Sequence, residues 1–328
     1  MSISCLCTVC GMASDPSNPH DMYLRNFLGR PDDAASELQP LLPKELAARL
    51  KWGAMRRVSA TFVSKDMVDR QSDLLFQIPL DGRDAFIYLL LEHQSSNDRM
   101  MAFRMLEYVV GIWSNYLREN PKKKTLPPII PVVVHVGPSG PVWSASLEVA
   151  ELIDIAPDLR AMVSEYLPRM RYLLDDVKAL DLKTLLARPL TPHARVVLVL
   201  VKTIGNLDVQ KAHLPDLMPD LLAILAGQGG KQDFATTVKY LIDRGKLPID
   251  ILLSLLEGLG PEAKEVMVTT GEMLRAEGEA RLLLKVLVSR FGPVSVAVER
   301  RVWAAGVEQL EVWAERVFTA ATVDEALA

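Results

Sequence analysis

The chain has 328 residues, of which 49% are hydrophobic and 24% are charged, so it can bury one large core and a smaller one, and disorder throughout is excluded. Its formal net charge of −4 argues against a protein that coats nucleic acid nonspecifically. The longest apolar runs stop far short of the roughly 18 residues that span a bilayer, and the first residues lack the basic region of an export signal. We therefore expect a cytoplasmic protein with no membrane segment.

Charge is distributed unevenly along the chain. Residues 51–124 contain 12 Lys and Arg against 9 Asp and Glu, whereas residues 265–328 contain 7 basic against 10 acidic side chains. If the protein binds a polyanion such as DNA, we expect the first half of the chain to bind it.

The cysteines all lie in the leader formed by residues 1–19, as Cys5, Cys7 and Cys10. Their spacing could hold a soft metal ion, but a closed zinc site needs a fourth ligand, and no nearby residue has a suitable spacing. We favour the alternative that the natural chain starts at Met12, because the residues before it match nothing in the rest of the sequence. In either case we expect no catalytic cysteine in the folded part.

Residues 20–190 alternate strand-like and helical segments, which predicts an α/β or α+β domain. Between the second and third strands, an apolar stripe at helical spacing predicts a helix, and Arg104, Asn115 and Arg118 fall off that stripe. The stripe consists of Met101, Met105, Tyr108, Val109, Ile112 and Tyr116, and the expected strands are residues 73–78, 85–94, 129–136 and 170–177.

The rest of the chain is expected to be entirely α-helical. We expect a helical region over residues 191–270 and a small helical C-terminal domain over residues 271–328. The apolar stripe of that last domain, which includes Leu283 and Leu287, is too large for a short helix to bury alone. We therefore expect it to pack on the middle helices or on a second copy of the chain as a homo-oligomer.

A β-hairpin is predicted around the sequence DGRD, residues 81–84. We expect Gly82 and Arg83 to form its two-residue turn, although another turn with an even number of residues is possible. In this register Asp73 on the first strand lies directly opposite Glu92 on the second, with Cβ atoms about 5 Å apart.

Two carboxylates at this spacing could share a divalent cation. Like charges opposed in a sheet are destabilising, and an ion such as Mg²⁺, which prefers oxygen ligands, would remove the repulsion. Strand alternation puts Gln94 on the same face as Glu92 and turns His93 to the other face, which favours a supporting role for the His93 side chain over a catalytic one. The alternative is a solvated sheet edge that binds no metal.

Five sequence blocks, taken in order, resemble the Rpn family of recombination-promoting nucleases and transposase-like proteins, within the PD-(D/E)XK nuclease superfamily. The resemblance covers Pro19 to about Pro189, and the segment from about Gly271 resembles a helical domain that often follows these nucleases. It implies a restriction-endonuclease-like mixed sheet flanked by helices, followed by an all-α region. The blocks are NPHDMYLRNFLG, RQSDLLFQIPL, YLLLEHQS, RMLEYVVGIW and PPIIPVVVHVGPSGPVW.

The resemblance also implies an endonuclease that hydrolyses DNA with the help of Mg²⁺ or Mn²⁺. Asp73 matches the motif aspartate of the superfamily, and Glu92 matches the first residue of its E-x-K element. Gln94 occupies the place of the lysine, and its amide can hydrogen-bond to water but carries no positive charge. The backbone carbonyl of His93 is implied as a further metal ligand.

Other polar residues near these motifs could assist. Asp21, at the head of the first helix, is expected to be an N-cap, with an extra acidic group near the metal as the alternative. Glu37, on the next helix, is expected on a solvated face. Arg99 and Arg104 could hold a phosphate, whereas the run Lys122, Lys123 and Lys124 is either a solvated loop or a contact to the DNA backbone.

A second function remains open on the sequence alone. The chain could be a nuclease-fold protein that has lost catalysis and acts as a DNA-binding or assembly factor in transposition or defence. The presence of Asp73, Glu92 and Gln94 together favours the enzyme.

Overall fold

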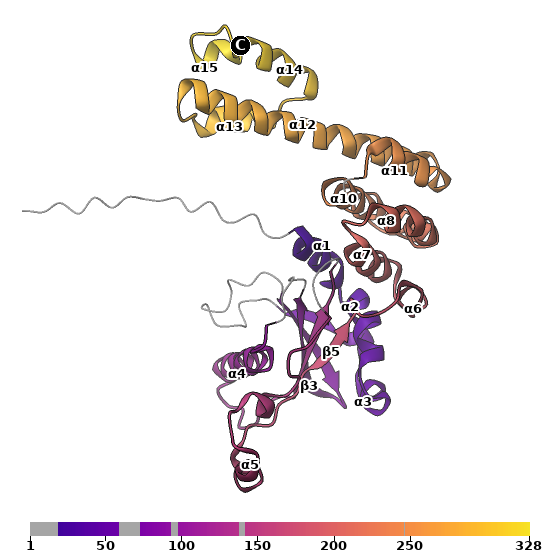
Figure 1. Ribbon diagram of the computed structural model, residues 1–328, viewed down its shortest axis with the longest axis vertical. Coiled ribbons are helices and arrows are strands. Elements are labelled where there is room, and N and C mark those ends of the chain that lie inside the picture. The colour runs from indigo at the N-terminus through magenta and orange to yellow at the C-terminus, as the bar shows by residue number, and fades with distance from the viewer. Residues whose placement is uncertain (1–18, 59–72, 93–97, 138–141, 246) are drawn as a thin grey trace, which may run out of the picture. The chain divides into compact units, whose positions relative to one another are not determined.

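A computed structural model describes residues 19–58, 73–92, 98–137, 142–245 and 247–328. The chain divides into two compact units at the Asn206–Leu207 bond. The first unit contains the β-sheet and the helices that cover it, and the described elements of the second unit are all helices (Figure 1).

The first unit is built on a mixed sheet, whose described strands lie in the order β1-β2-β3-β4-β5. Antiparallel pairing joins β1 to β2 and β2 to β3, and parallel pairing joins β3 to β4 and β4 to β5. The four predicted strands are confirmed within the described residues, whereas β1 was not predicted. The strands are β1 (Arg56–Val58), β2 (Asp73–Leu80), β3 (Arg83–Glu92), β4 (Ile129–His135) and β5 (Leu173–Asp176).

The hairpin between β2 and β3 turns one residue earlier than predicted. Asp81 and Gly82 form the turn, and Leu80 pairs with Arg83. Both turn residues have positive φ angles, 48° and 78°, as a type I′ turn requires, and Asp-Gly is one of the pairs that favour this turn. The predicted register is therefore wrong by two residues.

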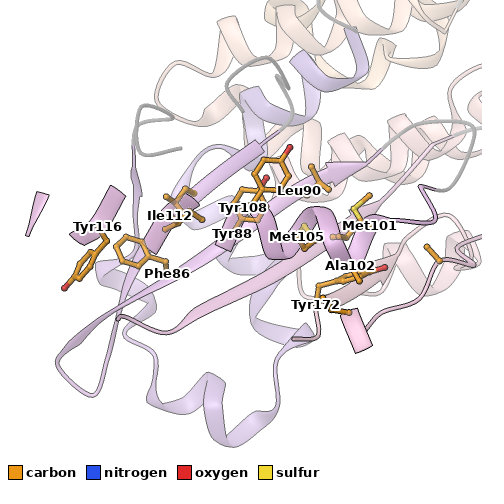
Figure 2. Close-up of a cluster of buried hydrophobic side chains, with 14 residues drawn as sticks. Phe86, Tyr88, Leu90, Met101, Ala102, Met105, Tyr108, Ile112, Tyr116 and Tyr172 are labelled. Carbon is orange, nitrogen blue, oxygen red and sulfur yellow. The ribbon is translucent and has the colours of Figure 1, made fainter. Parts of the chain in front are cut away.

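One face of the sheet packs against α4 (Met101–Glu119). Figure 2 shows this core, in which the Tyr88 and Tyr108 rings lie 4.9 Å apart. Every residue of the predicted apolar stripe is buried, which confirms the helix. Asn115 is buried too, although it was predicted off the stripe, and its amide donates to the Glu119 carboxylate at 3.3 Å.

The other face is covered by α1 (Pro19–Leu28), α2 (Pro31–Leu38) and α7 (Pro192–Thr203), which pack on one another. Helices therefore lie on both sides of β3 and β4 (Figure 1). This explains the continuous apolar run Leu89–Leu91, since a central strand with helices on both faces of the sheet is buried on each face. The predicted start of a separate helical region at residue 191 falls inside this unit, because α7 packs with α1 and α2. Its other helices are α3 (Lys44–Arg49), α5 (Pro157–Val163) and α6 (Leu182–Leu186).

The second unit is organised around the long helix α12, which continues through the predicted boundary at residue 271. Leu283 and Leu287 of α12 pack with residues of α13 and α14 in one buried cluster. No helix in the described residues is both long and apolar enough to cross a membrane. The helices are α8 (Leu207–His213), α9 (Met218–Ala226), α10 (Gly230–Asp243), α11 (Ile249–Leu255), α12 (Pro261–Phe291), α13 (Val296–Trp303), α14 (Val307–Arg316) and α15 (Val323–Ala326).

Candidate active site at the end of the parallel strands

The two predicted acidic positions lie at the same edge of the sheet, because Asp73 begins β2 and Glu92 ends β3. Asp73 pairs with Leu90, so it is not directly opposite Glu92 as predicted. Glu92 lies two residues beyond Leu90, and a shift of two residues keeps the same face of the sheet. Asp73 and Glu92 are therefore diagonal neighbours on one face, at positions about 7–8 Å apart.

Strand pairing extends this row of residues across the sheet. Glu92 pairs with His135 on β4, and His135 pairs with Asp176 on β5, so all three positions share the face that α4 covers. His135 is 1% exposed, and its Nδ1 lies 2.8 Å from Oδ1 of Asp176. The other oxygen of Asp176 accepts a hydrogen bond of 2.9 Å from the backbone N–H of Trp143. No motif in the sequence indicated a role for His135 or Asp176.

Trp143 and Tyr172 hold this His–Asp pair in place. The Trp143 ring meets the His135 ring edge to face, with centroids 5.1 Å apart, and its indole N–H donates to the Tyr172 hydroxyl at 3.0 Å. That hydroxyl in turn donates to the Ser146 carbonyl at 3.0 Å. Burial raises the pKa of Tyr172 to about 12, so the hydroxyl keeps its proton and remains a donor. The imidazole of His135 is thus fixed beside the Glu92 position.

Asp21 is the third residue of α1, which begins at Pro19. The predicted N-cap is therefore wrong, since an N-cap residue precedes the first helical residue. Asp21 lies in the first turn and is 7% exposed, and the partial positive charge of a helix N-terminus stabilises a carboxylate there. Its alternative role, as an extra acidic group near a metal ion, stays a prediction.

Glu37 was expected on a solvated face, but it is 1% exposed, and the expectation is wrong. The reason is Arg188, whose guanidinium lies 3.3 Å from Glu37 and donates to both oxygens of Asp175 at 2.7 Å. Burial and the neighbouring Asp175 raise the pKa of Glu37 well above its ordinary value. Although burial acts in the opposite direction, hydrogen bonds from Arg188 and Glu37 lower the pKa of Asp175.

This buried cluster serves the fold rather than the candidate site. Asp175 alternates with Asp176 along β5 and so faces the opposite side of the sheet. Glu37 comes from α2, and Arg188 from the segment that leads to α7. The cluster therefore joins three parts of the first unit on the face away from Glu92 and His135.

Both predicted phosphate-binding arginines lie near the start of α4. Arg99 is exposed in the turn that precedes the helix. Arg104 is half-buried on the first turns, and its guanidinium pairs with Asp98 at 2.9 Å. Both follow β3 closely in the chain, on the side of the sheet where Glu92 ends its strand.

The predicted lysine contacts lie at the other end of the sheet. Lys122, Lys123 and Lys124 are exposed and follow the last residue of α4. The 19 residues of this helix rise about 28 Å, and β4 begins beside Phe86, far from the Glu92 end of β3. These lysines are thus separated from the acidic edge by the length of the sheet.

Within the described residues, no three His, Cys, Asp or Glu side chains gather as a group that could hold a metal ion. Several predicted positions lie outside the described residues, so their roles stay predictions. They are Cys5, Cys7, Cys10, Met12, His93 and Gln94.

Comparisons with known proteins place these features in context. Residues 18–226 match the protein family described as "Putative transposase, YhgA-like". The chain is similar to recombination-promoting nuclease RpnD of Escherichia coli O157:H7, with 33% identity over 129 residues, which covers 39% of this chain and 49% of RpnD. The match therefore spans about half the length of that relative.

Two other relatives match over most of their length. Recombination-promoting nuclease RpnA of Escherichia coli K12 is 24% identical over 272 residues, which covers 82% of this chain and 88% of RpnA. The inactive recombination-promoting nuclease-like protein RpnE of the same strain is 25% identical over 272 residues, covering 81% of this chain and 84% of RpnE. No solved structure matches the chain.

Proposed function

This chain belongs to the YhgA-like transposase family, and from that premise we propose that it is a divalent-metal-dependent endonuclease that hydrolyses DNA phosphodiester bonds in recombination, transposition or defence. The observation that carries the proposal is the placement of Asp73 and Glu92 on one face at the same edge of neighbouring strands. Relatives named as recombination-promoting nucleases support the same class of activity.

Asp73 and Glu92 would hold the cation, with the backbone carbonyl of His93 as a third ligand. Carboxylate and carbonyl oxygens are the donors that Mg²⁺ prefers and that also suit Mn²⁺, so the donor set at this edge fits either ion. When bound, the ion supplies Lewis-acid stabilisation of the charge that develops on the phosphate.

The remaining residues would act on water and on the phosphate. Gln94 would orient the attacking water through its amide group, which can both donate and accept hydrogen bonds. Arg99 and Arg104 would approach the phosphate from the start of α4 and offset its negative charge. His135, fixed by Asp176, would line the floor of the site next to Glu92.

A second function is favoured by one specific observation. The relative RpnE, which matches this chain over most of its length, is named as inactive. A chain that kept the fold but lost hydrolysis would act as a DNA-binding or assembly factor. The replacement of the superfamily lysine by Gln94 is compatible with that loss.

The helical unit would mediate self-association of the protein. Leu282 and Phe318 are 64% and 71% exposed, and both line an apolar groove of about 250 Å³ between α12 and the end of α14. Exposed apolar surface of this kind is typical of protein–protein contacts. A second copy of this chain is the partner we propose.

Plasmid cleavage separates the two functions. Purified protein is incubated with supercoiled plasmid in buffers that contain Mg²⁺, Mn²⁺, Ca²⁺ or EDTA. The endonuclease proposal predicts nicked or linear plasmid with Mg²⁺ or Mn²⁺ and none with EDTA. Plasmid that is bound and shifted in a gel, yet stays intact with every ion, would support the binding factor instead.

A further inference from the structure

Two arginines from different elements lie together at the edge of the sheet in the first unit. Arg25 is in the last turn of α1, and Arg57 is the middle residue of β1. The Arg57 guanidinium packs against the backbone just after α1, so closely that a Cβ atom on Gly29 would lie 2.6 Å from its Nη1. A residue without a side chain is therefore required at position 29 for this approach.

Neither guanidinium group makes a hydrogen bond or an ion pair within the described part of the chain. Arg49, Arg104 and Arg188 of the same unit differ, because each pairs with an aspartate. Burial, together with the charge of Arg25, lowers the pKa of Arg57, although an arginine stays charged at neutral pH. Two like charges are thus held together with no carboxylate among the described residues to offset them, an arrangement that favours binding of an anion.

Arg57 lies near the acidic edge but on the other face of the sheet. It pairs with Phe76 on β2, three residues from Asp73, and this odd offset puts Phe76 and Arg57 on the face opposite Asp73. At about 3.3 Å per residue and about 4.8 Å between strands, the Cα atoms of Arg57 and Asp73 lie roughly 11 Å apart. Because the two side chains leave the sheet in opposite directions, the phosphates that they would contact are farther apart than these Cα atoms.

We propose that Arg25 and Arg57 form a phosphate clamp that holds the DNA backbone on the face of the sheet opposite the acidic pair. The guanidinium fork matches the geometry of phosphate oxygens. A contact to the backbone positions DNA without reading its sequence, so the clamp serves any duplex. The relation of the clamp to the cut rests on the proposed function, whereas binding of DNA by the arginine pair does not.

The clamp is tested by DNA binding in the absence of cleavage. A fluorescein-labelled duplex is titrated in EDTA at several KCl concentrations with the full chain and with an Arg25→Gln/Arg57→Gln variant, and fluorescence anisotropy gives Kd. The matched control is Arg169→Gln/Arg171→Gln, which removes two exposed arginines just before β5, at the opposite edge of the sheet. Both variants change the net charge equally.

Each lost phosphate contact lowers the slope of log K against log [salt] by about 0.9. The clamp therefore predicts a slope smaller in magnitude by about 1.8 for the Arg25/Arg57 variant. Binding should weaken to a similar extent for duplexes of unrelated sequence. The control variant should keep the wild-type slope. Thermal denaturation verifies that each variant is folded, and Arg25→Gln alone, with an expected loss of about 0.9, serves if the double variant does not fold.

The outcomes separate the clamp from the nuclease. An unchanged slope in a folded variant overturns the clamp even if the wild type cleaves plasmid. A lower melting temperature with an unchanged slope would mean that the two arginines stabilise the C-terminal end of α1, whose partial negative charge attracts cations. This result also overturns the clamp. A reduced slope in a protein that never cleaves DNA supports the clamp and overturns the proposed hydrolysis.

Discussion

Replacing Arg188 with methionine tests the buried cluster that joins α2, β5 and the segment before α7. In the wild type, two hydrogen bonds of 2.7 Å from Arg188 compensate the charge of Asp175, which is buried. Removing one partner of a buried ion pair leaves an uncompensated charge and costs about 3–5 kcal/mol. For a unit of this size, 1 kcal/mol corresponds to about 2–4 °C in Tm, so Tm should fall by roughly 6–20 °C.

The pH dependence of this loss gives a second check. In the wild type the pKa of Asp175 is lowered. The ionised carboxylate of Asp175 therefore contributes stability above the unfolded pKa of the group, and this contribution is lost as pH falls through the folded pKa. Without Arg188, burial raises the pKa of Asp175, and the carboxyl group takes up a proton more readily. The difference in Tm between wild type and variant should therefore be largest at neutral pH and shrink in acid.

Thermal denaturation followed by circular dichroism between pH 4 and pH 8 measures both effects. Arg169→Met is the matched control, because Arg169 is exposed, and its loss should change stability by no more than about 0.5 kcal/mol. An Arg188→Met protein that melts within about 0.5 kcal/mol of the wild type at neutral pH would refute the reasoning. A difference that grows in acid would contradict it as well.

Three further predictions concern other parts of the chain. Glu37→Gln should raise Tm at neutral pH but not at pH 4. The pKa of Glu37 is raised in the folded protein, so the carboxyl group contributes stability below its unfolded pKa, and this contribution is lost as pH rises through the folded pKa. An equal effect on Tm at both pH values would count against this account. Asp176→Leu should cost about 1–3 kcal/mol in urea denaturation, because His135 and the Trp143 N–H lose a buried acceptor, and an unchanged midpoint would contradict the network. Leu282→Glu should shift the protein toward monomer in analytical ultracentrifugation if the groove beside Phe318 mediates self-association, and an unchanged mass distribution would exclude that surface.

The sequence predicted most of the sheet because its signals are local. Alternating or continuous apolar runs marked the four longer strands, and helical spacing marked α4. The face shared by Asp73 and Glu92 was also predicted correctly, because an error of two residues in the register leaves strand alternation unchanged. The error itself arose at the turn. A type I′ turn requires positive φ angles at both central residues, which Asp81 and Gly82 adopt, whereas the predicted pair Gly82 and Arg83 does not meet this requirement.

The missed features depend on contacts between distant segments. His135 and Asp176 meet because two parallel crossovers bring β3, β4 and β5 into register, and no local pattern reports such pairing. Glu37 was assigned to solvent because its partner Arg188 is 151 residues away. β1 contains Arg56 and Arg57 in three residues, which gives no apolar pattern from which a strand could be predicted.

Cleavage by single carboxylate variants tests the central claim most directly. Asp73→Ala and Glu92→Ala are compared with wild type on supercoiled plasmid in Mg²⁺, and Asp84→Ala, at the turn end of the same hairpin, is the matched control. We expect both site variants to stay folded and to lose cleavage, while Asp84→Ala cleaves like the wild type and Gln94→Lys retains or raises activity. An Asp73→Ala protein that cleaves at the wild-type rate, or wild-type cleavage that persists in EDTA, would contradict a metal-dependent nuclease at this edge of the sheet.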